Sequence, residues 1–390
     1  MDARRFLTDH LLLGLRLEAL APGCVDPRGA PAVLRRRAAA EPTFEPCRLV
    51  HAARWLRRTL RSVELPADLR RHLDAQLVAW ECLGELLDGR SVPFRTRVER
   101  YHQVAVGFGE PDEYHRAHRE LANALGARRD LVGALHAVDP VIPAARVVPL
   151  ARAFARSLRE HTRAVVGLPA QESVRIELVT GRRWGALHEN LGDLRSVVRI
   201  NTDRGVRARR LPHLVAHEAY PGHHTESCHV DGLPELALRP VHGPRAVVSE
   251  GLAELGVRAV IGACWGRWAQ EIYADFGVRV DGDLFQQLRA AMELLRPVRQ
   301  DAALMLYESG TDEDEILAYL RRWLLVDDRG ARAILGFLAD PRWCTHASAA
   351  AAGVRLLGPL LGDLALRRVL TEPTLPADLR TPASTAEVAS

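Results

Sequence analysis

The segment LVAHEAYPGHHTE, Leu214–Glu226, gathers the residues best suited to chemistry in this 390-residue chain. It places His223 and His224 shortly after the pair His217 and Glu218. A His-Glu pair followed by another histidine is typical of zinc hydrolases, in which the imidazoles bind the metal and the glutamate acts as a base toward water. The segment therefore predicts a metal site with Glu218 as the base. The alternative is a polar helix end that binds no metal.

The spacing of these histidines differs from that of the usual zinc-binding helix. In the H-E-x-x-H motif the second histidine follows the first by one helical turn, but here that position is Pro221, which cannot bind a metal. On a continuous helix His224 would lie about 10.5 Å along the axis from His217, too far for both to bind one zinc ion at about 2.0–2.1 Å. Pro221 and Gly222 must therefore distort the chain, and two inserted residues would bring His223 to the ligand position. We expect His223 as the ligand and His224 as a wall or proton-relay residue.

A third ligand is expected from the helical pattern that follows. A catalytic zinc ion usually has three protein ligands and one open position. The segment VVSEGLAEL, residues 247–255, has the apolar spacing of a helix and carries Glu250 and Glu254 one turn apart. Glu250 is the expected third ligand, and Glu254 would orient a histidine. The alternative is that both glutamates lie on a solvent-exposed face, where glutamate is common.

These motifs resemble those of a bacterial family known as domain of unknown function 885. The family shares an H-E-x-x-P-G-H-H signature, which here reads HEAYPGHH, followed by SEG and a glutamate one turn later. Its members are regarded as zincin-like metallopeptidases, and the resemblance extends from the N-terminal helices to about Leu361. It implies a mainly helical, zincin-like α+β fold with a small sheet at the edge of a cleft. It also implies zinc as the cofactor, bound by His217, His223 and Glu250, with Glu218 as the base.

Arg296 and Tyr307 are the candidates for stabilising the oxyanion that forms during amide hydrolysis. Relatives carry a histidine at the position of Tyr307, and they carry tyrosines after DPRW, where this chain reads CTHASAAAAG. Arg296 and Tyr307 are eleven residues apart and so share one face of a continuous helix, although Pro297 can kink it. The alternative is that Arg296 forms a salt bridge and Tyr307 packs in the core.

Together these residues predict a zinc-dependent hydrolase of peptide or amide bonds that acts on a peptide-like or small amide substrate. Glu218 would activate the water that attacks a zinc-polarised carbonyl. Residues Ser196–Asn201 would form an edge strand that pairs with a peptide substrate. The alternative function is that of a diverged zincin-fold protein that binds metal and acts on, or only binds, a small metabolite.

The remaining pattern predicts a mainly α fold with a small β-sheet. Two short segments rich in β-branched residues, Ser173–Thr180 and Ser196–Asn201, predict strands. Apolar residues recur at helical spacing over 49–63, 68–87, 111–126, 145–166, 211–220, 244–260, 284–309 and 313–325. We expect an N-terminal helical region over 1–170, packed as one unit with a zincin-like catalytic region over 171–370. Residues 371–390 lack apolar periodicity and are rich in Pro, Ser and Thr, so we expect a disordered tail.

The composition argues against several other classes of protein. All 53 basic residues are arginine, so no mechanism can use a lysine nucleophile or the lysine of a phosphate-binding loop. A net charge of +4 and an aromatic content of 5% give no support for nucleic-acid binding. No stretch approaches the roughly 18 apolar residues of a membrane span. The six cysteines have no C-x-x-C spacing, so we expect a cytoplasmic protein with free thiols and no membrane partner.

The arginine-rich segment DRGVRARR, residues 203–210, precedes the metal-binding segment. It could receive an anionic group or a C-terminal carboxylate of a substrate. We favour the alternative, a solvent-exposed loop.

Overall fold

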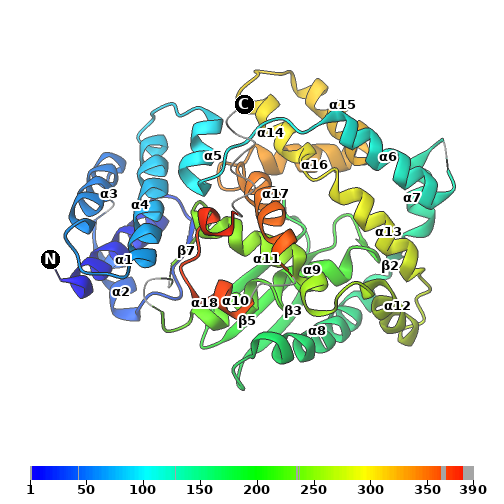
Figure 1. The fold of residues 1–390 in the computed structure, drawn as a ribbon, viewed down its shortest axis with the longest axis horizontal. Helices are drawn as coiled ribbons and strands as arrows, with labels where there is room; N and C mark the ends of the chain where they lie inside the picture. The colour runs from blue at the N-terminus through cyan, green and yellow to red at the C-terminus, as the bar shows by residue number, and fades with distance from the viewer. Residues whose placement is uncertain are drawn as a thin grey trace. The chain divides into compact units, whose positions relative to one another are not determined.

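The computed structural model describes residues 2–42, 44–127, 129–233, 236, 238–361 and 366–380. The chain is mainly helical with small sheets, as the sequence predicts (Figure 1). It forms two compact units. Unit 1 comprises Met1–Val106, His229–Gly251 and Ala352–Ser390, and unit 2 comprises Gly107–Cys228 and Leu252–Ala351. A boundary is expected near residue 170, but neither unit begins or ends there. The chain passes between the units at residues 106, 228, 251 and 351.

Unit 1 is built around the N-terminal helices, drawn in blue to cyan in Figure 1. Its elements are α1 (Ala3–Leu20), β1 (Val25–Asp26), α2 (Ala32–Ala40), α3 (Pro46–Leu60), α4 (Ala67–Leu87), α5 (Phe94–His102), β7 (Arg239–Pro240), η1 (Gly358–Leu360), α18 (Leu366–Thr371) and η2 (Pro376–Leu379). Its core lies between α1, α3 and α4, where side chains such as Phe6, Leu49 and Trp80 are fully buried. The apolar spacing of these helices predicts this packing.

The tail expected to be disordered from residue 371 is ordered through residue 380, which corrects that part of the expectation. Leu375 and Leu379 are buried, and the Leu375 N–H donates to the Asp378 carboxylate at 2.9 Å. Pro376 occupies the first turn of the short 3₁₀ helix η2, a position that suits proline. A local helix-start pattern with two apolar anchors therefore outweighs the polar composition. Residues 381–390 lie outside the described residues.

Unit 2 carries the chain's three-stranded sheet and the helices that pack around it. Its elements are α6 (Pro111–Leu125), α7 (Leu131–Val138), β2 (Val141–Ile142), α8 (Ala144–Val166), β3 (Ser173–Val179), β4 (Ala186–Gly192), β5 (Arg195–Asn201), β6 (Val206–Arg207), α9 (Leu211–Glu218), α12 (Trp265–Asp275), α13 (Gly282–Glu293), α14 (Val298–Tyr307), α15 (Glu313–Leu324) and α16 (Asp328–Leu338). The long helix α8 contacts β3, α9 and α12. Buried residues such as Phe154, Val198, Val215 and Tyr273 form the core that fixes α9.

Three helices are divided between the units. They are α10 (His223–Val230), α11 (Pro244–Val260) and α17 (His346–Leu357). The division falls after Cys228 in α10, after Gly251 in α11 and after Ala351 in α17. Each remains one continuous helix, so residues on either side of a division keep the fixed spacing of helical neighbours.

The sheet has the strand order β3-β5-β4, with β3 parallel and β4 antiparallel to β5. The strands predicted at Ser173–Thr180 and Ser196–Asn201 are confirmed as β3 and β5. However, β5 is the central strand, so the prediction that it is a free edge for a peptide substrate is wrong. Its backbone groups already pair with β3 from Ser173 to Val179 and with β4 on the other side.

The single helix expected over residues 284–309 is two helices, α13 and α14. Pro297 lies directly before α14, and the chain turns between Glu293 and Val298. Proline has no N–H to continue the helical ladder, and its ring crowds the preceding turn, so the helix breaks instead of kinking.

No described helix is long and apolar enough to cross a membrane. All six cysteines are free thiols in the structure, as their spacing predicts, and four of them are buried.

Candidate metal centre

Helices α9 and α10 are joined by a widened turn. The Gly222 N–H donates to the Ala216 carbonyl at 2.9 Å, and the Thr225 N–H donates to the Ala219 carbonyl at 3.2 Å. Each of these bonds spans six residues, whereas a regular α-helical bond spans four. The turn therefore contains two more residues than a continuous helix would, which confirms the distortion predicted at Pro221 and Gly222.

Two glycines allow the backbones around this turn to approach closely. A Cβ atom at Gly222 would lie 1.9 Å from the His217 carbonyl oxygen, so no side chain fits there. A Cβ atom at Gly256 of α11 would lie 3.0 Å from Cδ of Pro221. Helix α11 therefore packs directly against the turn, which is consistent with the general use of glycine where two backbones meet.

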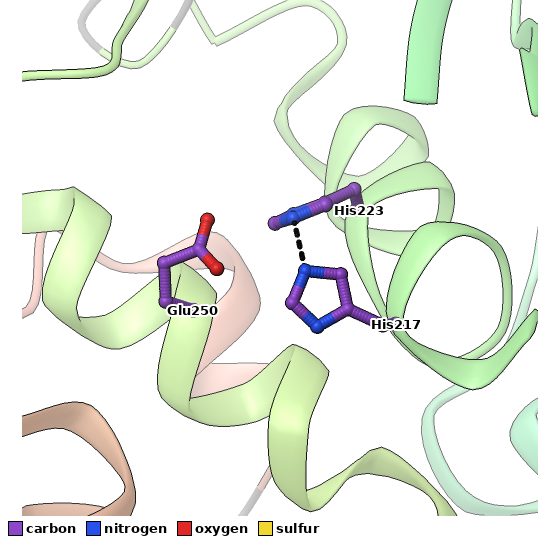
Figure 2. A group of neighbouring side chains, drawn as sticks. All are labelled: His217, His223 and Glu250. Atoms are coloured by element: carbon purple, nitrogen blue, oxygen red, sulfur yellow. Dashed lines mark hydrogen bonds between the residues drawn. The ribbon is translucent and has the colours of Figure 1, made fainter. Parts of the chain in front are cut away.

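His217, His223 and Glu250 lie together, and each offers one ligand atom within 4.8 Å of the others (Figure 2). The two Nε2 atoms are 3.2 Å apart, and the imidazole planes are at 89°. His217 is the penultimate residue of α9, and His223 is the first residue of α10. Glu250 lies on α11, one turn before Glu254. Of the two histidines that the sequence leaves open as second ligand, His223 is the one in this triad.

The donor set of the triad fits zinc. Two imidazole nitrogens and one carboxylate oxygen are the donors of many catalytic zinc sites, which keep a fourth position open. Two nitrogens bound tetrahedrally to one zinc ion at about 2.0–2.1 Å lie about 3.3 Å apart. The observed Nε2–Nε2 distance of 3.2 Å between His217 and His223 is close to this value. Without a cation, the same two nitrogens can share one proton in a hydrogen bond.

A carboxylate lies behind each imidazole of the triad. His217 Nδ1 is 3.6 Å from Oε1 of Glu254, and His223 Nδ1 is 4.0 Å from Oε2 of Glu226. In each ring, a proton on Nδ1 would therefore face a carboxylate. The other nitrogen, Nε2, is the one that faces the second imidazole. Carboxylates in this position fix the tautomer and the ring orientation of metal-binding histidines.

Glu254 is itself held by two arginines. Arg289 and Arg296 lie 3.1 Å and 2.9 Å from its Oε2. Burial alone would raise the pKa of Glu254, but these two guanidinium groups hold it well below its usual range, so Glu254 is a carboxylate at neutral pH. The structure thus shows the salt-bridge alternative for Arg296. Its partner is the Glu254 carboxylate, which it holds in position, and its oxyanion role stays a prediction.

Two other predicted site residues lie outside the triad. Glu218 is the last residue of α9 and is 8% exposed, and its charge acts on Arg210 at the start of the same helix. Tyr307 is the last residue of α14, and its hydroxyl donates to the Leu338 carbonyl at 2.9 Å. The base role of Glu218 and the oxyanion role of Tyr307 stay predictions.

His224 belongs to a different cluster, whose central residues His224, Glu172 and Ser196 are buried. Its Nδ1 lies 2.8 Å from Oγ of Ser196, and its Nε2 lies 3.0 Å from Oε2 of Glu172. His224 has no exposed surface, and its expected role as a wall or proton-relay residue stays a prediction. The hydrogen bonds continue to His188 Nε2, 2.8 Å from Ser196 Oγ. The cluster therefore anchors the start of α10 to strands β5 and β4.

Glu172 is the centre of this cluster, and the sequence analysis missed it. Tyr220 donates its hydroxyl to Oε2 of Glu172 at 2.6 Å, and Arg159 pairs with Oε1. Burial alone would raise the pKa of Glu172, but hydrogen bonds from His224, Tyr220 and Arg159 lower it to about 2. No spacing rule marks Glu172. The one available signal was its place directly before a predicted strand.

A scan against protein-family models finds no match for this chain, and a search of curated proteins finds none either. Among solved structures, the chain is similar to the crystal structure of a protein described as a "putative lipoprotein" from Colwellia psychrerythraea. The TM-score is 0.51 and the sequence identity is 17%. The match covers 85% of this chain and spans 65% of the length of that structure. At this identity the likeness shows a shared fold alone.

Proposed function

We propose that this protein is a zinc-dependent hydrolase of peptide or amide bonds. One observation carries the proposal, namely the convergence of His217, His223 and Glu250, each of which offers one ligand atom within 4.8 Å of the others. These residues come from the two motifs, HEAYPGHH and SEG, that resemble the domain of unknown function 885 family. The carboxylates behind both imidazoles give further support, because such partners are typical of metal-binding histidines.

His217, His223 and Glu250 would hold the zinc ion, and the ion would supply the positive charge that polarises a carbonyl and makes water more acidic. Glu218 follows His217 directly and is nearly buried. It would accept a proton from the attacking water and then deliver it to the leaving nitrogen. Glu254 and the arginines bound to it would keep the His217 ring in position during the reaction.

A direct test combines metal analysis with hydrolysis assays on the full chain. We expect about one zinc ion per chain after dialysis, and turnover of a peptide library that stops with a chelator and returns when zinc is added. Absence of bound zinc would contradict the metal site. Bound zinc with no chelator-sensitive turnover of any peptide or amide would contradict the hydrolase.

A second candidate is a metal-binding protein of the same fold that does not hydrolyse amides. It is favoured by the partners of the two expected oxyanion donors, since Arg296 binds Glu254 and Tyr307 binds the Leu338 carbonyl. Zinc binding without turnover in the test above is the result that this candidate predicts.

A further inference from the structure

Unit 2 contains a recess lined mainly by arginine, which we call the arginine recess. Its volume is about 460 Å³, within the range of small-ligand sites. The residues that line it are Arg182, Arg183, Asn201, Asp203, Arg204, Arg329, Arg332, Ala333, Gly336 and Ala339. These residues come from three places in unit 2, namely the β3–β4 loop, the end of β5 with the loop that follows, and α16. Five arginines and one aspartate give the lining a strong positive charge.

Carboxylates of the described residues balance only part of the positive charge of the recess, since the charges of Arg183 and Arg332 act on Asp340 and Asp328. The side chains of four of its arginines are exposed and form no hydrogen bond or ion pair with described residues, namely Arg182, Arg183, Arg204 and Arg332. Arg329 donates to a backbone carbonyl, that of Asp203, at 3.1 Å. The Asp203 carboxylate in turn accepts the backbone N–H of Gly181 at 2.8 Å. Guanidinium donors that meet no acceptor in the protein are available to an anionic ligand.

One loop of the recess also passes against the N-cap residue of helix α9. A Cβ atom at Gly185 would lie 2.7 Å from Nη2 of Arg210, so the loop that carries Arg182 and Arg183 passes directly against that guanidinium group. Asn201 holds this loop in place, because its amide donates to the Arg182 carbonyl at 2.8 Å. Arg210 is the N-cap of α9, seven residues before His217, which puts the two on the same side of the helix about 10.5 Å apart along its axis.

Arg210 and Arg299 add positive charge within electrostatic reach of Arg204 of the recess. Both reach solvent, yet partial desolvation and repulsion from Arg204 lower the pKa of each, that of Arg299 to about 10. The charge of Glu254 opposes this shift at both positions. Arg204 of the recess and Glu254 beside His217 therefore act on the same two guanidinium groups.

We propose that the arginine recess binds the carboxylates of an acidic peptide, and that such a peptide is the substrate of the metal centre. The claim that the recess binds an acidic peptide does not depend on the proposed function. The claim that this peptide is the substrate rests on the proposed hydrolase. An extended peptide presents side chains on one side about 7 Å apart. Successive carboxylates can therefore meet guanidinium groups that are spread over several segments, from Arg332 on α16 to Arg210 on α9.

The binding part is tested by calorimetry on the full chain with a chelator present, so that metal plays no role. The probes are a hexapeptide of alternating Ala and Glu, its counterpart with Gln in place of Glu, and inorganic pyrophosphate. We expect the Glu peptide to bind at least tenfold more tightly than the Gln peptide, and to bind more weakly as salt is raised. Equal binding of the two peptides would overturn the proposal. So would binding of pyrophosphate alone, which would point to a phosphorylated ligand instead.

The double variant Arg204→Gln, Arg332→Gln locates the site. It should weaken binding of the Glu peptide by about tenfold, since each lost guanidinium removes one exposed charge-assisted contact. The matched control is Arg35→Gln, Arg36→Gln on α2, which removes the same two charges from residues that do not line the recess. Both pairs are exposed, so both variants should fold, and thermal unfolding checks this. Equal affinity of the double variant and the control would overturn the location.

Hydrolysis separates the two proposals. Zinc-dependent cleavage with a preference for the Glu peptide, lost in the double variant, supports both. Zinc-dependent cleavage that ignores the Glu side chains overturns the substrate class and leaves the hydrolase intact. Glu peptide binding at the recess without cleavage of that peptide leaves the recess as a binding site and overturns the substrate class, and the hydrolase is overturned only if no peptide of the library is cleaved either.

Discussion

His223 and His224 are consecutive in the chain, but they belong to regions with opposite properties. His223 is partly accessible, and its Nε2 lies 3.2 Å from that of His217 within the triad. His224 has no exposed surface and is held between Glu172 and Ser196. Successive residues on a helix point about 100° apart, so one can face an accessible centre while the next enters the core. Neighbouring histidines in a motif therefore need not share a role: one suits a ligand, the other an anchor.

The largest expected effect is on catalysis beside the triad. Glu218→Gln keeps the shape of the side chain but removes the base, so kcat for peptide hydrolysis should fall by about 10²- to 10⁴-fold. Zinc content should stay unchanged, because Glu218 is not a member of the triad. Full turnover in this variant would exclude Glu218 as the base, and loss of zinc would make it part of the metal site.

The paired variants His223→Ala and His224→Ala test the comparison directly. A zinc site contributes roughly 10 kcal/mol or more through all its ligands, so loss of one of three should weaken zinc binding by about 100- to 1,000-fold. His224→Ala should leave zinc affinity of the folded protein nearly unchanged. It should instead lower the free energy of unfolding by roughly 3 kcal/mol, because a buried charge loses a partner. Zinc titration and urea unfolding of both variants measure these effects, and the reverse pattern would exchange the two roles.

Acid should weaken the buried cluster in a predictable range. The pKa of Glu172 is about 2 in the folded chain, below its ordinary value of 4.5. The stability gained from this difference is complete above pH 4.5 and is lost as the pH falls toward 2, by up to about 3 kcal/mol. Urea unfolding at several pH values measures it. Glu172→Gln should be less stable at neutral pH but should show a flatter pH dependence, and an unchanged dependence would contradict this role.

The smallest effect is expected behind the His217 ring. Glu254→Gln removes the carboxylate that faces Nδ1 of His217, and such partners contribute about 10- to 100-fold to metal affinity. A control is Glu293→Gln, which removes a carboxylate that also pairs with Arg289 but forms no ion pair with an imidazole of the triad. Competition with a zinc-binding dye measures both variants. Equal affinity of the two would show that Glu254 does not orient the imidazole.

The elements around the metal centre could be predicted from local patterns, because those patterns act within a few residues. The two-residue insertion at Pro221 and Gly222 follows from the failure of His217 and His224 to reach one ion. Strands β3 and β5 follow from their β-branched residues. Strand order does not follow from such patterns, since pairing of β5 with both β3 and β4 depends on the path of the whole sheet.

The rest of the site depends on contacts between distant residues. Glu172 and His224 are 52 positions apart, and Arg296 and Glu254 are 42 apart, so no spacing rule joins them. The arginine-rich segment 203–210 was expected as a solvent-exposed loop. Arg204 and Arg210 do reach solvent, but arginines from other segments gather beside them, which only the folded chain reveals.

The hydrogen bonds that span six residues between α9 and α10 have a wider consequence. Without residues 221 and 222, the printed sequence reads His-Glu-Ala-Tyr-His, the four-residue spacing of an uninterrupted zinc-binding helix. Insertions are usually accommodated at exposed loop tips, whereas this pair is buried in the turn between two helices. Here both imidazoles remain adjacent, because the two extra residues lie in a wider turn whose hydrogen bonds span six residues instead of four. The number of positions between two metal-binding side chains is thus a poor guide to their separation in space, and the His-Glu-x-x-His pattern alone would not identify this segment.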